Sequence, residues 1–413
     1  MKKSSLLGVL ILLLSTTLFT QELVKIVTYN VLNYPDNSYT RNTYFEKIFD
    51  ELDADIVVVQ EIESQSGVNE FQSKVLGAKF QSGTFVNGPD DDKALFYRDS
   101  LFTFISNTPI STELRDINEF KVVHNFTLDT LRIYAVHLKA SDGSSERDQR
   151  LREITNLRNV TDQLPENTYY MVLGDFNVYY SNEPAIQKLI DQSTTGYFLD
   201  PINQLGNWHN NSGYAFLHTQ STRANNIGDG GASGGLDDRF DQILVSQSIM
   251  NNGGIDYVES SYYAFGNDGN HFNSSINSGT NTSVSNEIAD ALYYGSDHLP
   301  VVATFDFGIS TGIKEGNNIA TDFTLKQNYP NPFNPSTNIS YNIPVESNVT
   351  IKIYDMLGRE ITELLNSNKL AGNYTTGWNA SAFSAGVYFY SIEAVSLASN
   401  EYFRETKKMI LMK

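Results

Sequence analysis

The sequence predicts an α/β first part and a small all-β last part, on three observations. Apolar strand-like runs and amphipathic helical stretches alternate over residues 24–307. After residue 323, short β-type runs alternate with Asn, Gly and Pro turns, and the segment between, Gly308–Asn318, is a linker by composition. At 413 residues the chain is also too long for one ordinary domain. We therefore expect domains at 21–309 and 323–413, joined by a linker at 310–322.

Residues 1–20 have the pattern of a cleaved secretory signal peptide. Lys2 and Lys3 form a basic start, and Leu6–Leu14 is an apolar run too short to span a bilayer. No later segment is long and apolar enough for a membrane helix. The sequence therefore predicts a secreted protein without stable membrane insertion.

Periodicity places the elements in order. Two stretches carry apolar residues on one helical face, namely Phe45, Ile48, Phe49 and Leu52, and then Leu151, Ile154, Leu157 and Val160. Strand-like runs of the first domain occupy 24–29, 55–60, 131–136, 169–173, 240–245 and 299–305. In the last domain, runs at 338–343, 349–354 and 386–392 predict a small β-sandwich.

Polar side chains stand at the ends of these strands. Four runs end at Asn30, Glu61, His137 and the pair Asp175 and Asn177, whereas two begin at Asp241 and Asp297-His298. If the last two strands are antiparallel to the other four, all these groups meet along one edge. A lone histidine or aspartate there is ordinarily a cap, a turn or a core residue. Agreement among six strand ends is hard to attribute to turn chemistry alone.

The residue types at these ends suggest phosphate chemistry. Asn, Glu and Asp oxygens suit Mg²⁺ or Mn²⁺, hard cations that bind substrate phosphates. The chain has no cysteine, so any metal must use oxygen or imidazole ligands. Histidines with separate carboxylates can carry charge to a phosphate and protonate a leaving oxygen. The set therefore predicts metal-assisted phosphoester hydrolysis.

The motifs at these ends resemble the endonuclease/exonuclease/phosphatase superfamily, which includes deoxyribonuclease I, abasic-site endonucleases, sphingomyelinases and inositol phosphatases. In order they are Thr28-Tyr-Asn30, Val59-Gln-Glu61, Val136-His-Leu-Lys139, Gly174-Asp-Phe-Asn177, Arg239-Phe-Asp241 and Ser296-Asp-His298. The resemblance covers residues 24–307 and implies a deoxyribonuclease I-like two-sheet α/β sandwich.

The resemblance also implies roles by position. The metal would be held by Glu61, with Asn30 and Asp297. Asp175 would act as general base, with Asn177 orienting the water or the phosphate. His298, steered by Asp241, would contact the phosphate, and His137 would serve the leaving side. Abasic-site enzymes have tyrosine at the position of His137, so this chain looks more like the deoxyribonuclease I and sphingomyelinase branches.

Other candidates carry less weight. Arg98, Arg147 and Arg150 are weighed as phosphate contacts, although exposed arginines usually only pair or solvate. His271 is a lid candidate, with a solvated loop histidine as the favoured alternative. The Gly-rich loop 228–235 lacks the lysine of a phosphate-binding loop, and we interpret it as a flexible rim of the site.

The last domain resembles the sorting domain of the type IX secretion system. The matching residues are Asn328–Thr337, Tyr354–Gly358, Gly386–Tyr390 and the basic end from Lys407 to Lys413. The resemblance implies export to the outside or the cell surface, with the secretion machinery as a partner. On physical grounds alone, a small β module that binds carbohydrate or stabilises the enzyme stays open.

Charge bears on the substrate. The chain carries a net −19, and residues 21–322 hold 19 basic against 41 acidic side chains. Such a surface repels polyanions, so bound cations must act locally. We expect a secreted, monomeric nuclease that uses Mg²⁺ or Mn²⁺, with Ca²⁺ as an alternative structural ion. A sphingomyelinase-like phospholipid hydrolase, another phosphoesterase and a catalytically dead binding protein remain the alternatives.

Overall fold

The structure is a computed structural model that divides the chain into two compact units, Met1–Ser310 and Thr311–Lys413. It describes residues 22–35, 40–90, 92–251, 253–308, 323–328, 331–369, 372–380, 383–396 and 402–412. The predicted signal peptide and linker lie outside these residues.

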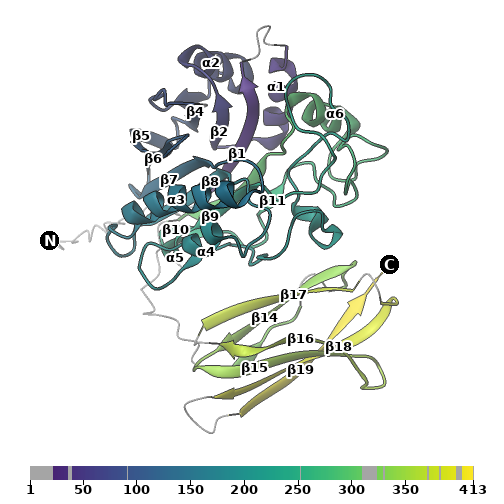
Figure 1. The fold of residues 1–413 in the computed structure, drawn as a ribbon. Coiled ribbons are helices and arrows are strands. Elements are labelled where there is room, and N and C mark those ends of the chain that lie inside the picture. Colours follow the sequence, from purple (N-terminus) through teal and green to yellow (C-terminus); the bar gives the residue numbers. More distant parts are fainter. Residues whose placement is uncertain are drawn as a thin grey trace, which may run out of the picture. The chain divides into compact units, whose positions relative to one another are not determined.

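Two mixed sheets form the centre of the first unit (Figure 1). The first has the order β10 (Ile255–Tyr257), β12 (Val301–Phe307), β1 (Leu23–Tyr34), β2 (Ile56–Ile62), β4 (Asp92–Arg98) and β3 (Phe80–Ser82), with β11 (Tyr263–Ala264) also paired to β12. The second has the order β5 (Phe102–Ile110), β6 (Ile117–His124), β7 (Thr130–His137), β8 (Tyr169–Asp175) and β9 (Asp241–Val245).

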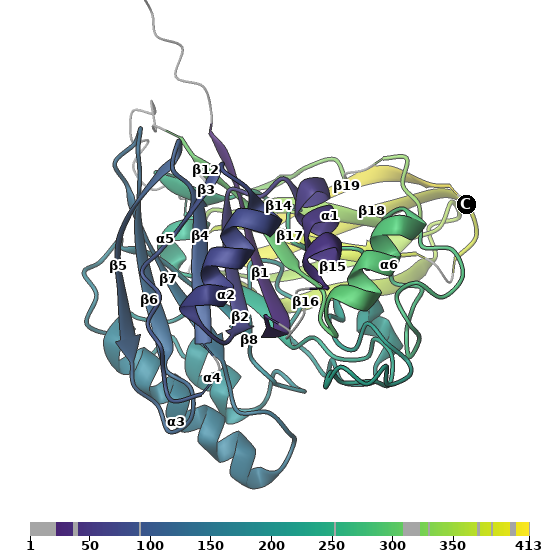
Figure 2. The same cartoon turned by 90° about the horizontal axis from the view of Figure 1, so that it is seen from above.

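Helices cover the outer face of each sheet (Figure 2). Those of the first sheet are α1 (Asn42–Leu52), α2 (Gln65–Glu70), the π-helix Phe71–Leu76 and α6 (Asn286–Gly295). Those of the second are α3 (Ser144–Thr161) and α4 (Pro184–Ile190). The short α5 (Gln247–Met250) follows β9, and a 3-10 helix spans Ser212–Leu217. The predicted two-sheet α/β sandwich is confirmed.

Alternation along the strands explains the layers. In β1, Val27 and Tyr29 pack with the helices, whereas Val24 and Ile26 face the second sheet. Successive side chains of a strand point to opposite faces, so one apolar run serves two cores. The strands are therefore buried on both sides, which is why they are nearly continuous apolar runs.

Strand direction decides where the polar ends meet. β1 is parallel to β2, and β7 is parallel to β8. β12 is antiparallel to β1, and β9 is antiparallel to β8. The antiparallel arrangement expected for the strands that begin at Asp241 and after His298 is therefore confirmed.

Strand β1 runs further than predicted. β1 continues beyond Asn30 to Tyr34, and its pairing with β2 shifts register between these residues. Leu32 and Asn33 have positive φ values of 49° and 46°. A strand is predicted from alternating side chains. The irregularity interrupts this alternation locally, so the pattern does not reveal that the strand continues. The predicted end of this strand at Asn30 was therefore wrong.

The second unit consists of two antiparallel sheets. One has the order β13 (Thr324–Leu325), β14 (Ser336–Ile343) and β17 (Gly372–Asn379). The other has the order β16 (Glu360–Lys369), β15 (Ser347–Tyr354), β18 (Gly386–Ser396) and β19 (Tyr402–Leu411). They share a core that includes Trp378 and Tyr390, and the predicted small β-sandwich is confirmed. Among the described residues, no helix combines the length and apolarity needed to cross a membrane.

Candidate functional site

Three neighbouring strands of the second sheet, β7, β8 and β9, bring three predicted residues side by side. In the register of the sheet, Asp175 lies opposite His137 on β7 and opposite Asp241 on β9. Gly174 has a φ of 132°, and a side chain there would collide with the carbonyl oxygen of Val136. The glycine of Gly-Asp-Phe-Asn is therefore required by the close approach of β7 and β8.

Asp175 is the centre of the cluster and is only 1% exposed. Its Oδ2 accepts a hydrogen bond of 3.2 Å from Asn30 Nδ2. The same oxygen lies 3.5 Å from His137 Nε2 and 3.7 Å from His298 Nε2. Its Oδ1 accepts the backbone N–H of Asn177 at 3.0 Å. Both oxygens are thus held, and one of them faces two imidazoles.

Glu61 lies beside this carboxylate. Its Oε1 accepts a 2.8 Å hydrogen bond from Asn30 Nδ2 and lies 3.8 Å from His137 Nε2. Its Oε2 accepts the backbone N–H of Asn33. Glu61 has a φ of 60°, an uncommon conformation that costs free energy and is often found at functional sites. Asn30 Oδ1 accepts the N–H of Leu32, so the amide oxygen of Asn30 is already engaged.

His298 is oriented by a buried carboxylate. Its Nδ1 lies 2.7 Å from Asp241 Oδ2, and both side chains are buried. With Nδ1 directed at Asp241, Nε2 faces Asp175. Ser296 accepts the backbone N–H of His298 and donates to the carbonyl oxygen of Asn30, which ties this segment to β1.

Asp297 and Asn177 complete the predicted set. Asp297 Oδ2 accepts the N–H of Ala232 at 2.7 Å, whereas its buried Oδ1 has no hydrogen-bond partner among the described residues. No hydrogen bond or ion pair joins Asp297 to Asn30 or Glu61 within the described ranges. Asn177 has a φ of 51°, and its Nδ2 donates to the carbonyl oxygen of Leu138. Asn177 therefore lies next to Asp175, whereas Asp297 is bonded to the backbone of the glycine-rich loop.

Burial and charge act against each other at the two central groups. Burial raises the pKa of Asp175, while His298 and His137 favour its charged form and lower that pKa in part. Burial lowers the pKa of His298. Three carboxylates outweigh this and raise that pKa well above the ordinary imidazole value; in order of effect they are Asp241, Asp297 and Asp175. The site therefore places a buried carboxylate beside a buried imidazole whose charged form its neighbours favour, in a region away from water where electrostatic interactions are strong.

The oxygen donors fit a hard divalent cation in part. The Glu61 side chain is 14% exposed and thus open to an ion, and Asp297 has a buried oxygen without a partner. Carboxylate oxygens are the ligands that Mg²⁺ and Mn²⁺ prefer. Asn30 turns its nitrogen toward Glu61, so here it positions this carboxylate instead of presenting an oxygen. Its predicted role as a direct ligand stays a prediction.

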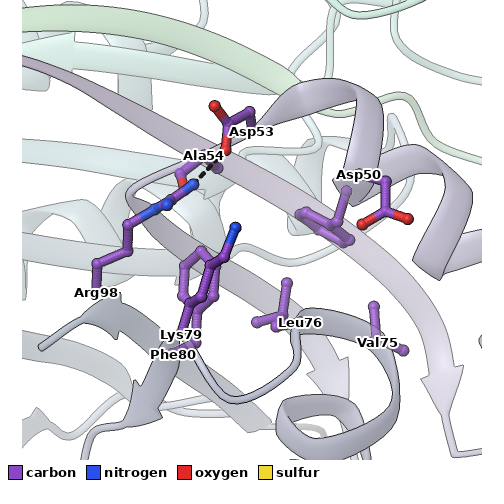
Figure 3. Close-up of a pocket in the computed structure, with 9 residues that line it drawn as sticks. Asp50, Asp53, Ala54, Val75, Leu76, Lys79, Phe80 and Arg98 are labelled. Atoms are coloured by element: carbon purple, nitrogen blue, oxygen red, sulfur yellow. Dashed lines mark hydrogen bonds and ion pairs between the residues drawn. The ribbon is translucent and has the colours of Figure 1, made fainter.

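None of the three arginine candidates reaches the cluster. Arg98 pairs with Asp53 and Asp55 at the start of β2, opposite the end that carries Glu61. It lines a cavity of about 110 Å³ together with Lys79 and Phe80 (Figure 3). This arginine therefore has a structural role.

The other two arginines are held by acidic partners. Arg150 is fully buried and donates to Glu183 Oε2 and to the carbonyl oxygens of Lys139 and Ser141. Arg147 pairs with Asp142 at 2.8 Å and keeps a partly exposed side chain. Neither forms a hydrogen bond or ion pair with the central cluster among the described residues.

His271 is not a solvated loop histidine, and that favoured reading was wrong. It is 3% exposed, its Nδ1 lies 2.8 Å from Asp268 Oδ1, and its Nε2 lies 3.0 Å from the carbonyl oxygen of Ser278. Asp268 also accepts from the backbone of Thr282. Through its bonds to Ser278 and Thr282, this pair stabilises the long loop before α6. The sequence around His271 does not reveal these contacts.

Gln220 is a site residue that sequence reasoning missed. Its Nε2 lies 2.6 Å from His298 Nε2 and donates to Asp297 Oδ2 at 3.3 Å. The two ends of an amide have the same shape, so a doubly protonated His298 would face the amide oxygen instead. Gln220 belongs to a loop with neither periodicity nor a motif, and therefore no sequence signal distinguishes it.

The sequence was compared with models of known protein families. The model of the Endonuclease/Exonuclease/phosphatase family matches residues 27–298, about two thirds of the chain, and this stretch holds every predicted site residue. The chain belongs to the endonuclease/exonuclease/phosphatase family. Enzymes of this family are typically metal-dependent phosphoesterases and nucleases.

The last unit matches the secretion system C-terminal sorting domain over residues 327–411. This domain directs type IX export, so the protein reaches the cell surface or the outside and interacts with the secretion machinery. The predicted localisation is therefore confirmed.

Three solved structures resemble part of this chain at low identity. TDP2 from D. rerio, complexed with a single strand DNA product, is 16% identical, with 68% of this chain and 98% of that chain covered and a TM-score of 0.47. A family protein from Bacteroides thetaiotaomicron is 15% identical, with coverages of 70% and 96% and a TM-score of 0.46. The human Nocturnin catalytic domain with bound sulfate is 16% identical, with coverages of 70% and 97% and a TM-score of 0.43. A search of curated proteins finds no match.

Proposed function

We propose that the first unit of this exported family member is a divalent-cation-dependent phosphodiesterase that cleaves nucleic acids. One observation carries the proposal: the buried Asp175 carboxylate lies between two imidazoles, His137 and His298, and next to Glu61. This arrangement would provide a base, an acid and a carboxylate that can hold a cation within reach of one phosphate. We also propose that the enzyme acts as a monomer.

In the proposed reaction, water attacks the phosphorus atom. Asp175 accepts the proton of this water as its oxygen forms the new bond to phosphorus, and Asn177 orients the water. The bond from phosphorus to the leaving oxygen then breaks, and this oxygen takes a proton from His137. His298, held by Asp241, donates a hydrogen bond to a non-bridging phosphate oxygen and balances its growing charge.

The cation would be held by Glu61 and Asp297, with Asn30 positioning Glu61. When bound, Mg²⁺ or Mn²⁺ supplies positive charge that neutralises the phosphate. Neutralisation matters here because residues 21–322 carry 41 acidic against 19 basic side chains. Calcium, as a structural ion, is a further candidate.

Two features favour nucleic acid over lipid or a damaged site in DNA. His137 stands where abasic-site enzymes have tyrosine, which favours general diester cleavage. Enzymes that act on membrane lipids need exposed apolar side chains to enter the interface. Among the described residues, the segment from Gly266 to Asp290, a long loop and the first turn of α6, exposes no large hydrophobic side chain, and Ile276 in it is buried.

A substrate panel tests the proposal. The mature full-length protein is incubated with plasmid, single-stranded DNA, RNA, sphingomyelin vesicles and small phosphomonoesters, with Mg²⁺, Mn²⁺ or excess EDTA. We expect cleavage of nucleic acid with either ion and none with EDTA. Cleavage of sphingomyelin alone would reject the nuclease proposal but would still support a phosphodiesterase. Full activity in EDTA, or no activity on any of the esters, would reject both proposals.

A further inference from the structure

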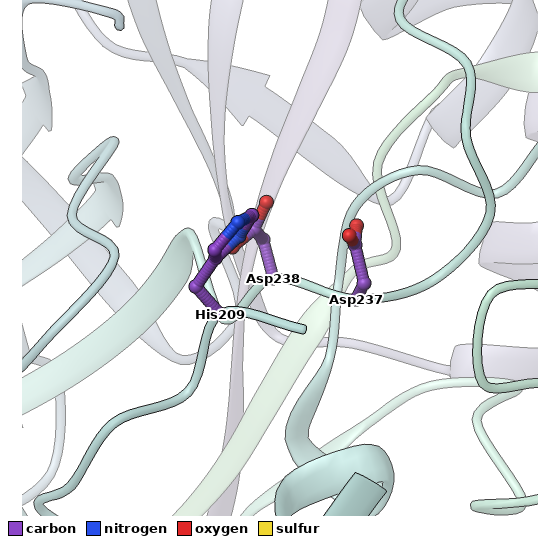
Figure 4. Close-up of side chains that lie close together, drawn as sticks. All are labelled: His209, Asp237 and Asp238. Carbon is purple, nitrogen blue, oxygen red and sulfur yellow. The ribbon is translucent and has the colours of Figure 1, made fainter. Parts of the chain in front are cut away.

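A second group of metal-ligating side chains lies outside the catalytic cluster. It consists of His209, Asp237 and Asp238, and one ligand atom of each lies within 4.8 Å of those of the other two (Figure 4). His209 belongs to the loop after Trp208, whereas the two aspartates follow the glycine-rich loop. None of these side chains has a part in the proposed reaction. The resemblance to the family assigns no role to them either.

The backbone holds these donors in place. The N–H of Asn210 donates to the carbonyl oxygen of Asp237 at 2.8 Å, which joins the two loops. The N–H groups of Asp237 and Asp238 both donate to the carbonyl oxygen of Gln220. His209 packs edge-on against Tyr179 at 5.1 Å between ring centroids. The donors are therefore arranged before any ion arrives, which lowers the entropic cost of binding.

The charge of this group is unbalanced. His209 Nδ1 lies 2.8 Å from Asp238 Oδ1 and is the only basic partner that either aspartate has among the described residues. The nearby arginines form ion pairs with other carboxylates: Arg147 pairs with Asp142, and Arg239 pairs with Asp200.

Burial adds to this imbalance. It raises the pKa of Asp237 and, with Asp237 and Asp142 acting in the same direction, raises the pKa of Asp238 to about 7 in spite of His209. Two adjacent carboxylates, half withdrawn from water with one imidazole beside them, are costly to keep charged unless a proton or a metal cation accompanies them.

We propose that His209, Asp237 and Asp238 form a second divalent-cation site, separate from the Glu61 site, that takes an ion with affinity for imidazole such as Mn²⁺ or Zn²⁺. One nitrogen and two carboxylate oxygens suit these ions better than Ca²⁺ or Mg²⁺, which favour all-oxygen surroundings. Three protein ligands leave coordination positions for water or a substrate oxygen.

The position of this site is informative. Asp238 precedes the catalytic Asp241 by three residues, and Tyr179 follows Asn177 by two. The carbonyl oxygen of Asp238 also accepts the N–H of Gln220, whose side chain meets His298. An ion here adds two positive charges next to the catalytic cluster, on a unit rich in acidic groups. The inference concerns ion binding and stands whether or not the unit cleaves phosphodiesters.

Counting bound Mn²⁺ tests the inference. Full-length protein is stripped with EDTA, dialysed and titrated with Mn²⁺, and free Mn²⁺ is followed by electron paramagnetic resonance. We expect two ions per wild-type chain, one in Glu61→Gln, one in Asp237→Asn and none in the double variant. In the Glu61→Gln background, Asp237→Asn and His209→Ala should each weaken Mn²⁺ binding by about 10–100-fold or more.

Asp142→Asn is the matched control. It removes a negative charge that acts on Asp238 but no ligand atom, so the second ion should remain. If Asp237→Asn and His209→Ala, folded by circular dichroism, bind as many ions as the wild type, the proposed site is wrong. If Asp142→Asn also lost the second ion, binding would depend on general negative charge and not on these three ligands. This result would also reject the site. A wild type that binds one ion, lost in Asp237→Asn and kept in Glu61→Gln, would support this site and contradict the proposed catalytic one.

Discussion

Two of the histidine–aspartate pairs in the first unit, His298–Asp241 and His209–Asp238, have nearly equal geometry but different surroundings. Nδ1 lies 2.7 Å from the carboxylate in His298–Asp241 and 2.8 Å in His209–Asp238. The side chain of His298 is 3% exposed, whereas that of His209 is 37% exposed. Beyond its partner, His298 meets the central Asp175, but His209 meets aromatic rings and a second half-buried carboxylate.

The hydrogen bond between a histidine and a carboxylate therefore does not determine the role of the histidine. Three buried carboxylates raise the pKa of His298, and its Nε2 faces the Asp175 carboxylate, which suits contact with a phosphate. His209 lacks such a partner and instead completes a set of donors for an ion. What surrounds a pair, more than its own geometry, decides which chemistry it can serve.

The largest expected effect distinguishes the two regions outright. Asp175→Asn should lower kcat by about 10²–10⁴-fold, because the amide cannot accept the proton of the attacking water. Asp238→Asn removes the same charge from the other region and should change kcat far less when the Glu61 site is saturated with Mg²⁺. Steady-state kinetics on a nucleic-acid substrate measures both, and equal losses would contradict the assignment of the base.

The second test concerns the orientation of His298. Asp241→Asn should lower kcat by on the order of 10²-fold or more, because the imidazole loses its fixed tautomer and its charge. The melting temperature, measured alongside, separates this effect from unfolding. Folded Asp241→Asn with wild-type kcat would show that His298 needs no orienting carboxylate.

Glu61→Gln sharpens the distinction between the two proposed ion sites. The Mg²⁺ concentration for half-maximal activity should rise by about 10–100-fold, because one anionic ligand is lost. Asp237→Asn should leave this midpoint near the wild-type value. A Mg²⁺ titration of the initial rate gives both midpoints, and an unshifted midpoint in Glu61→Gln would remove this residue from the ligand set.

Gln220→Ala probes the link between the regions. The side chain contacts His298 and Asp297, so its loss should lower kcat about tenfold with little change in KM. Gln220→Glu keeps the length and one oxygen, and recovery of kcat in this variant would support contact through the oxygen with a protonated His298. A change in KM alone would indicate a role in substrate binding instead.

The smallest catalytic effect is expected at the opposite end of the sheet. Arg98→Ala leaves the carbonyl oxygen of Ala54 without its side-chain donor and removes the ion pair with Asp55, so the free energy of unfolding should fall by about 1–3 kcal/mol. Its kcat should stay unchanged at temperatures well below unfolding. Urea denaturation measures the first quantity, and a drop in kcat without loss of stability would place Arg98 in the reaction.

The sequence by itself predicted the order of the units, the six strands whose ends carry the polar residues, two helical faces and three strands of the last unit. These features depend on local patterns: alternation and helical periodicity reflect which side is buried, and the motif that begins at Gly174 marks the end of a strand. The β-sandwich of the last unit follows from the same kind of pattern.

Only the tertiary structure decided which contacts those residues make. Asn30 and Asp175 are 145 positions apart and share a hydrogen bond, and the side chain of Gln220 reaches a histidine 78 positions further on. The same applies to the group of His209, Asp237 and Asp238, which meets across two loops. Loops have no periodicity, and the conformations of Leu32, Asn33 and Glu61 depend on packing that no neighbour in sequence dictates. Local patterns therefore determined which face and which edge each residue occupies, whereas long-range packing decided its partner.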